Sequence, residues 1–507
     1  TLSGRNPAFG GTNNPPVRYE FRQDAAGNLI PAQVTQYAGP TGGFWSNVDL
    51  NMGIFIQDQW TLKRLTLNLG VRYDKLHVTN PATVRPAGPF LGELRFDEVK
   101  GVPDWQDINP RVGAAYDLFG NGRTAIKAAF GRYVISESLG IATATNPSAA
   151  LAASVSRSWA DANGNLTPDC TLTSNAANGE CGAVSSTTFG TATFNTRYDP
   201  DYLSGFGVRP FNYQANAIVQ QELGKGMGLS VGYFRTWYGN ITVTDNLAVT
   251  PADYDQYCVT APTDSRLGSV SGQQICGLYD LNPSKFGQVD RFIRTEDGRS
   301  EVFNGMDIAF RSKFGNGGML NAGVSLGVIG IDNCTVVDRP DFYLETTGPN
   351  VTDRFCKTDN SQHQVKINAT YPLAWGIGAS AIYQNLPGTD RLATFTTSNA
   401  AIAPSLGRNL SGCPAAGNCT LTRQVALLEP FTNRERRASQ LDVRFTKSFN
   451  LNATAKFRVG FDIYNLMNRD DVLLLVNNYS NSSATGLWRP TSVLAARLYK
   501  FNARIDF

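Results

Sequence analysis

Several short stretches of the sequence carry residues that could bind a metal ion or attack a substrate. The stretch "DANGNLTPDC" (161–170) places Asp161, Asn163 and Asn165 at the first, third and fifth positions of an EF-hand-like loop, followed by Asp169. Side-chain oxygens of this kind are the ligands that calcium prefers. Leu166, however, stands where the EF-hand glycine belongs. A structural calcium site is therefore a hypothesis, and its alternative is an Asn/Gly turn that presents a cysteine.

The stretch "GVSLG" (323–327) matches the pattern around a hydrolase nucleophile. In that motif the serine sits on a sharp turn from a strand into a helix, and an acid and a histidine follow. Here Ser325 lies inside an alternating strand, and His363 is the one histidine after it. The sequence contains no P-loop, dinucleotide fingerprint or HExxH motif. We therefore predict that the protein is not an enzyme.

The eight cysteines fall between the expected strands, two in each loop that contains any. Pairing within each loop is the economical assignment. A zinc site is disfavoured, because no CxxC spacing occurs and His77 lies far from His363. Loop disulfides indicate an oxidising compartment and would restrain loops that we expect to have little core of their own. The predicted pairs are Cys170 with Cys181, Cys258 with Cys276, Cys334 with Cys356, and Cys413 with Cys419.

The composition favours strands and excludes some partners. Charged residues make up 17% of the 507 residues, below the roughly 25% usual in soluble proteins. The net charge is +3 and no long Lys/Arg block occurs, so no nucleic-acid partner is expected. Mean hydropathy is −0.23, and no apolar run reaches the about 20 residues of a membrane helix. The start "TLSGRNPAFGG" lacks a methionine and a signal-peptide pattern, which indicates a processed or truncated N-terminus.

Six β-hairpins are predicted from the alternation of apolar and polar side chains. In the first, apolar residues at every second position from Leu65 to Tyr73 follow a tight turn at Lys63 and Arg64. The pattern recurs around the turns "FGNGR", "GKGMG", "FGNGG", "LAWG" and "FNLN". With the final strand "LYKFNARIDF", we predict about thirteen long strands. They are longer than the roughly five or six residues typical of a soluble sandwich, which is the alternative fold.

The connections are short at one end of these strands and long at the other. Turns of about two to five residues close each hairpin, whereas loops at 135–209, 244–297, 332–360 and 390–436 join the hairpins. Periplasmic turns and long extracellular loops are typical of outer-membrane barrels. The sequence therefore predicts an all-β fold, a transmembrane antiparallel β-barrel over residues 46–507, with residues 1–45 as an extracellular loop segment.

The two faces of the strands also fit a barrel in a membrane. Apolar side chains on one face would meet lipid, and charged side chains on the other would line a wet lumen. Aromatic residues near the short turns would form an interfacial girdle. The charged positions are Lys127, Lys366, Lys456, Arg458, Arg444, Asp462 and Asp307, and the aromatic ones are Trp60, Tyr116, Phe119, Phe314, Tyr371, Trp375 and Phe449.

Several phrases, in this order, resemble the C-terminal part of the barrel of TonB-dependent outer-membrane receptors, in particular the Oar-like branch. The similarity runs from about residue 45 to the end. The phrases are "GIFIQDQWTLKRLTLNLGVRYD", "NPRVGAAYDLFGNGRTAIKAAFGRY", "VGYFRTWYGNITVTDNLAVTPADYDQYC", "CGLYDLNPSKFGQ" and "KFRVGFDIYNLMN", with the "DANGNLTPDC" loop.

This resemblance implies a barrel of about 22 strands in the bacterial outer membrane, filled by an N-terminal plug. It also implies a TonB box through which an inner-membrane complex supplies energy. The plug, the TonB box and about nine strands are not among these residues, so coupling to the TonB complex would run through a part outside them. A thirteen-stranded sheet with two open edges would not be stable alone in lipid.

The expected function is energy-coupled movement of a large or scarce ligand across the outer membrane. The alternatives are a surface adhesin or structural protein and, with less support, a passive porin. Binding residues concentrate in loops on a rigid scaffold, so substrate or partner proteins should meet the long extracellular loops. Tyr254, Tyr257, Tyr279 and Phe286 are candidate contacts there, or else pack between loops.

The last strand presents Tyr499, Ile505 and Phe507 on one face. This ending resembles the C-terminal signal that the outer-membrane insertion machinery reads, so that machinery and the membrane lipid are expected partners. Closing the barrel would require this strand to pair with a first strand outside these residues.

Overall fold

The computed structural model describes residues 2–6, 16–23, 27–39, 43–343, 351–352, 354–414, 417–452, 454–479 and 486–507. The expected loop segments 1–45, 332–360 and 390–436 therefore lie partly outside the described residues. Among the described residues, no helix is both long and apolar enough to cross a membrane.

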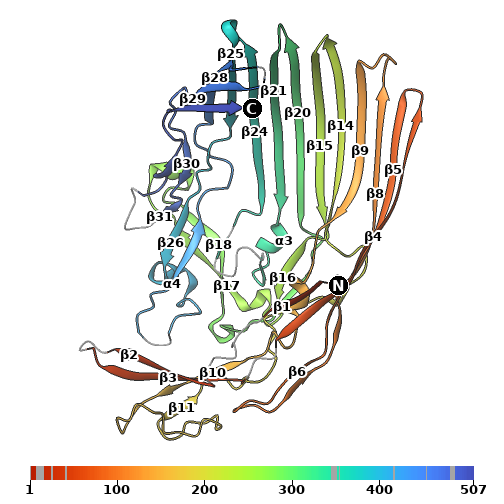
Figure 1. Cartoon of the computed structure of the whole chain (residues 1–507). Helices are drawn as coiled ribbons and strands as arrows, with labels where there is room; N and C mark the ends of the chain where they lie inside the picture. Colours follow the sequence, from red (N-terminus) through yellow and green to blue (C-terminus); the bar gives the residue numbers. More distant parts are fainter. Residues whose placement is uncertain are drawn as a thin grey trace.

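One curved antiparallel sheet holds all the long strands, which stand side by side as a wall (Figure 1). The short strand β13 (Ser204–Phe206) belongs to the same sheet and pairs in parallel with β8 (Val99–Asp117). The strands follow one another across the sheet in the order β1 (Leu2–Asn6), β4 (Phe44–Leu62), β5 (Leu65–Asn80), β8 (Val99–Asp117), β9 (Thr124–Val134), β14 (Phe211–Gly224), β15 (Met227–Gly239), β20 (Ser300–Phe314), β21 (Gly318–Asp332), β24 (Lys357–Pro372), β25 (Ile377–Leu386), β28 (Ala438–Asn450), β29 (Lys456–Tyr464) and β33 (Leu498–Asp506).

The six predicted hairpins and the final strand are confirmed. Every pair closes around the predicted turn, and the first brings Leu62 opposite Leu65 across Lys63 and Arg64. Lys63 adopts the left-handed φ of 54° that a two-residue hairpin turn needs. The final strand β33 pairs with β29 along its whole length. The alternation of apolar and polar side chains was sufficient to predict these strands. The pairing register of two strands is largely fixed when one face of each must be apolar.

The two ends of this sheet remain apart. β1 covers only residues 44–48 of β4, and β33 pairs on one side only. Within the described residues, the rest of the outer edge of β4 and the second edge of β33 have no strand partner. Such edges carry unpaired backbone groups, which lipid cannot satisfy.

The long loops contain further strands and short helices, which the sequence pattern did not predict. The strands form six small sheets among the described residues, three that join segments of different loops and three that lie within one connection. The sheets, in spatial order, are β11 (Cys181–Val184), β10 (Ser154–Trp159), β3 (Leu29–Tyr37) and β2 (Val17–Gln23); β12 (Thr196–Tyr198), β19 (Arg291–Thr295), β16 (Thr242–Asn246) and β22 (Phe342–Tyr343); β23 (Val351–Thr352), β27 (Thr422–Ala426), β26 (Thr394–Ser398) and β31 (Asn478–Tyr479); β17 (Tyr254–Thr260) and β18 (Gln274–Leu281); β30 (Val472–Leu475) and β32 (Pro490–Val493); and β6 (Thr83–Arg85) and β7 (Leu94–Phe96).

The helices are short and lie in the loops. They are α1 (Gly140–Ala144), α2 (Pro200–Leu203), α3 (Cys334–Val337) and α4 (Asn399–Leu406), with 3-10 turns η1 (Pro251–Asp253), η2 (Ser265–Val270), η3 (Pro283–Lys285) and η4 (Ala374–Gly376).

The expectation that the loops have little core is wrong. The described residues of 254–281 and 394–426, which we call the loop module, bury a cluster that includes Leu267, Leu278 and Ile402, each at most 1% exposed. A second cluster, around Trp105, lies where β5 and β8 leave the wall and meet α1 and α2. Both clusters draw residues from segments far apart in the chain, and burying that apolar surface stabilises the loops.

Candidate functional site

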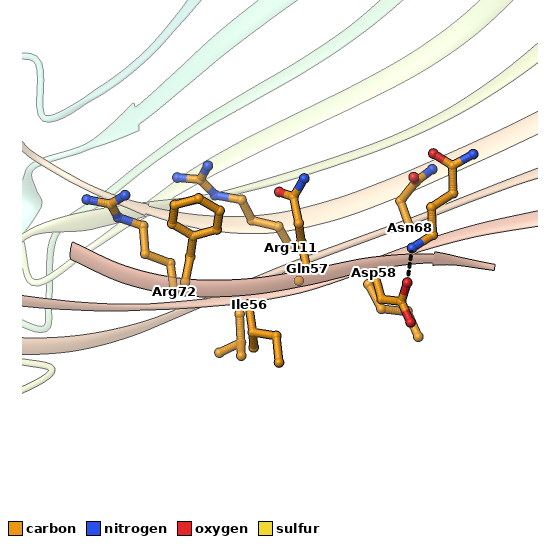
Figure 2. A pocket seen from close by; sticks show the side chains of 11 residues that line it. Ile56, Gln57, Asp58, Asn68, Arg72 and Arg111 are labelled. Carbon is orange, nitrogen blue, oxygen red and sulfur yellow. Dashed lines mark hydrogen bonds between the residues drawn. The ribbon is translucent and has the colours of Figure 1, made fainter.

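The inner face of the wall is polar and hollowed. Figure 2 shows Arg72, Arg111 and Gln57 on the side of the ribbon that faces the other strands of the curved sheet, and Ile56 on the opposite side. These residues line a cavity of about 440 Å³ over β4, β5 and β8. Apart from Asp58, which lies on the side of Ile56, the alternation places the labelled polar groups inside and the apolar one outside, as predicted for a barrel wall.

A network of hydrogen bonds orders the charged groups near the long-loop end of this face. The carboxylate of Asp74 accepts hydrogen bonds from Arg72 Nε at 2.8 Å and from Asn109 Nδ2 at 2.7 Å. Arg132 Nη1 donates to Asp107 at 2.8 Å and to Asn109 Oδ1 at 2.9 Å. The sequence analysis did not predict this network, because a strand pattern shows which face a side chain occupies but not its partner on the next strand.

The charged positions predicted for the inner face do lie opposite the apolar ones. Arg444 on β28 and Asp462 on β29 are register partners and pair through Arg444 Nη2 at 2.8 Å. Lys366 lines a second cavity, of about 290 Å³, with Arg311. The remaining predicted positions are Lys127 on β9, Asp307 on β20, and Lys456 and Arg458 on β29.

Aromatic side chains form a belt at each end of the wall. The predicted short-turn belt is exposed, from Trp60 on β4 to Trp375 in η4. A second belt, which the sequence analysis missed, lies near the long loops, where Tyr213 stacks on Phe130 at 5.5 Å and contacts Trp237 at 5.4 Å. Two belts that bound an apolar band are what the two interfaces of a membrane require.

The serine of "GVSLG" is placed inside β21, as the alternation predicted. Its register partner on β24 is Gln364, and His363 lies opposite Leu326 instead. Because neighbouring positions of a strand point to opposite faces, Ser325 and His363 lie on different sides of the sheet. These two residues therefore cannot form a nucleophile and base pair.

All four predicted disulfides form. The expectation that no cysteine lies in a strand is wrong in detail, since Cys181, Cys258 and Cys276 belong to the loop strands β11, β17 and β18. The disulfides still lie outside the barrel wall and inside single loops, which agrees with an oxidising compartment.

The loop from Asp161 to Asp169 is ordered by its own side chains. The Asp161 carboxylate accepts hydrogen bonds from the backbone N–H groups of residues 164–166, and Asp169 accepts hydrogen bonds from the side-chain amides of Asn163 and Asn165. Leu166 takes a left-handed φ of 55° in place of the EF-hand glycine. No group of three or more His, Cys, Asp or Glu residues in the described part of the chain is placed to hold a metal. A calcium ion bound by Asp161, Asn163, Asn165 and Asp169 stays a prediction.

The four aromatic candidates for ligand contact have different environments. Tyr257 is 1% exposed and belongs to the core of the loop module, which is the packing role. Tyr254 and Tyr279 are half-buried on β17 and β18, and Phe286 is 59% exposed after η3. Tyr254, Tyr279 and Phe286 are thus accessible, whereas Tyr257 is buried in the interior.

The sequence analysis missed the buried carboxylate of Asp280, which links several segments of the loop module. The Asp280 side chain, 1% exposed, accepts hydrogen bonds from Arg408 Nη1 at 2.6 Å and Arg423 Nη2 at 3.2 Å. Arg408 also bonds to Asp255, at 2.7 Å. Burial would lower the pKa of Arg408, but its bonds to Asp280 and Asp255 outweigh burial and raise it. The guanidinium therefore stays charged and joins β17, β18 and the segment after α4.

A second buried carboxylate, Asp471, anchors the link between β29 and β33. Its buried side chain accepts hydrogen bonds from Arg469 Nε, Arg436 Nε and the Ser439 N–H. Burial would raise the pKa of Asp471, but these bonds outweigh it and lower the pKa. A lowered folded-state pKa stabilises the fold above the ordinary value of about 3.9, and this stabilisation is lost as pH falls through the folded pKa.

We therefore expect pepsin to cut the 465–497 link of the intact protein faster at pH 3 than at pH 5, after each rate is divided by that for an unstructured peptide at the same pH. The D471N variant should be cut faster at pH 5 already and should change less between the two pH values. D470N is the matched control, because the neighbouring side chain of Asp470 is 83% exposed. Equal cleavage of D471N and the parent protein at pH 5 would contradict this role.

The residues of the expected insertion signal lie along β33 and just after it. Tyr499, Ile505 and Phe507 are exposed on the outer face, where Tyr499 stacks on Phe461 at 6.0 Å. This agrees with contact with lipid, while recognition by the insertion machinery stays a prediction.

Comparisons with known proteins agree with this architecture. The family model described as "Outer membrane beta barrel domain" matches residues 7–381. No curated protein matches the sequence.

Similar solved structures include the outer membrane transporter YddB from Escherichia coli, at 10% identity and a TM-score of 0.42, over 95% of this chain and 55% of that one. The FrpB iron transporter from Neisseria meningitidis has 10% identity and a TM-score of 0.43, over 94% and 52%. The chain thus spans about half the length of these structures. Because the family model covers most of the sequence, the chain belongs to the outer membrane β-barrel family and is a protein of the bacterial outer membrane.

Proposed function

We propose that this chain is part of a TonB-dependent outer-membrane transporter of the Oar-like branch, which moves a large or scarce ligand across the membrane. The observation that carries the proposal is the charged inner face, with Arg72, Asp74, Asp107 and Arg111 on strands whose other face is apolar. Charged groups on a membrane-spanning wall need water or another protein part against them. A plug domain, which the resemblance expects outside these residues, would occupy that side.

A surface adhesin is the second candidate, and the loop module favours it. This module has its own core and two disulfides, Cys258–Cys276 and Cys413–Cys419. A rigid extracellular surface of this kind could hold a partner without transport. In either case we propose Tyr254, Tyr279 and Phe286 as contacts on the ligand or partner.

Binding to TonB separates these functions without knowledge of the ligand. Full-length protein, including any upstream plug, should co-purify with the periplasmic domain of the host's TonB protein, and deletion of the TonB box should abolish this. An adhesin would not bind that domain with or without the deletion. A passive porin would instead conduct small ions in a planar bilayer without an energy source, and that result would reject the transporter.

A further inference from the structure

A cavity of about 520 Å³ lies where the long-loop ends of the wall meet the loop 135–209. Its lining includes the rings of Tyr198, Phe211 and Tyr238 and the carboxylates of Glu137 and Glu301. Strand pairing fixes part of this arrangement, because β14 holds Phe211 opposite residue 239 of β15, and β15 in turn pairs with β20, which carries Glu301. Glycine at position 239 makes room for the Phe211 ring, since a Cβ there would come within 2.3 Å of it.

The charged residues that line this cavity are both acidic. Glu137 and Glu301 carry the charge, and no lysine or arginine is in the lining. Glu137 Oε1 accepts hydrogen bonds from the Ser138 and Gly140 N–H groups, each at 2.9 Å, which hold its carboxylate in place. Glu301 is half-buried, and its carboxylate forms no hydrogen bond or ion pair with any described residue.

Three basic groups lie near this cavity but do not line it, and one of them, Arg299, donates a hydrogen bond to the carbonyl of the lining residue Thr242. The Arg132 guanidinium lies 4.3 Å from the centroid of the Phe211 ring, but Asp107 pairs with it at 2.8 Å. Arg209 is buried, with its guanidinium 5.2 Å from the Trp105 ring, and is close enough to Glu137 for electrostatic attraction. Of the two carboxylates, that of Glu301 is therefore the one without a hydrogen-bond or ion-pair partner of its own in the described part of the chain.

We propose that this cavity binds the cationic group of a ligand, a guanidinium or ammonium such as a peptide's arginine or lysine side chain. The carboxylates would form charge-assisted hydrogen bonds with the cation, and the faces of Tyr198 and Tyr238 would attract it through their ring quadrupoles. An anionic ligand would instead meet two like charges. This inference deepens the proposed function by naming a ligand class for the loops, and it rests on the loops being a binding surface.

Two matched peptides test it on the full-length protein in detergent. The probes are the N-acetylated, C-amidated tripeptide Gly-Arg-Gly and its neutral counterpart with citrulline, and calorimetry measures their binding. We expect the arginine peptide to bind about tenfold more tightly, and E301Q to remove that preference. E222Q is the matched control, because Glu222 lies at the opposite, short-turn end of β14, and it should preserve the preference.

Y238L, at a ring that is 41% exposed, provides a second variant that leaves both carboxylates in place. It should weaken the arginine peptide several-fold and the citrulline peptide less. Equal binding of the two peptides to the parent protein, or an undiminished preference in E301Q, would overturn the proposal. A neutral oligosaccharide whose binding E301Q abolishes would overturn it too, by assigning a glycan site. Since these assays measure binding alone, TonB association can persist when this inference fails.

Discussion

Replacing Asp280 with alanine should destabilise the loop module by roughly 3 kcal/mol and leave the barrel wall intact. The carboxylate is 1% exposed and bonds to Arg408, Arg423 and the N–H of Ser411. Its loss would leave two partly buried guanidinium groups without their shared counter-ion. Removing one partner of a buried pair costs more than the pair itself contributes, because the desolvation of the remaining charge is no longer offset.

Hydrogen exchange of the intact protein measures this effect locally. D280A should lose protection in β17, β18, α4 and β27, while β20 and β21 in the wall keep theirs. D255A is the matched control, because Asp255 pairs with the same Arg408 but its side chain is 53% exposed. An exposed pair contributes at most about 1 kcal/mol, so D255A should resemble the parent protein. Equal protection in D280A and D255A would show that the buried pair does not hold the module together.

The barrel wall could be predicted from the sequence because its strands, turns and pairings involve residues that are close together in the chain. A strand such as Leu65–Asn80 alternates over its own length, its turn is two residues long, and its partner is the next strand. The pairing within each loop of Cys258 with Cys276 was predictable for the same reason. Each of these inferences needed only neighbours in the sequence.

The loop structure could not be predicted because its contacts are long-range. Asp280 is hydrogen-bonded to Arg408 and Arg423, which lie 128 and 143 residues further along the chain. No repeating pattern in the sequence links these positions. The parallel pairing of β26 with β31 joins two different loops. Tyr257 illustrates the consequence, since in sequence it resembles the accessible Tyr254 and in the fold it is core.

The cavity that contains Glu137 and Glu301 depends both on local strand pairing and on long-range loop contacts. The places of Phe211 and Glu301 follow from strand register, but Tyr198 and Glu137 reach the cavity only through the fold of the loop 135–209. The cluster around Trp105 packs part of that loop, at α1 and α2, against the wall. We therefore expect the cavity to depend on the stability of this cluster.

Trp105→Ala should consequently be the most damaging single change near this cavity, at about 3–5 kcal/mol. The Trp105 side chain is 0% exposed, its indole N–H donates to the Tyr202 carbonyl at 2.7 Å, and its ring meets the Tyr202 ring at 5.6 Å. Truncation would leave a large void and free α2 from β8. We expect chymotrypsin to cut the loop 135–209 of the intact protein faster, and binding of the arginine peptide to be lost.

Trp105→Phe separates the contribution of packing to loop stability from that of the indole hydrogen bond. It keeps most of the buried volume but leaves the Tyr202 carbonyl without its donor, which costs about 1–3 kcal/mol. Its cleavage rate should fall between those of the parent protein and W105A. The melting of the wall should stay unchanged in both variants, because β8 keeps its ladders with β5 and β9. If W105A lowers the melting temperature of the whole barrel instead, the loop and the wall fold as one unit, and the cavity cannot be lost separately from the barrel.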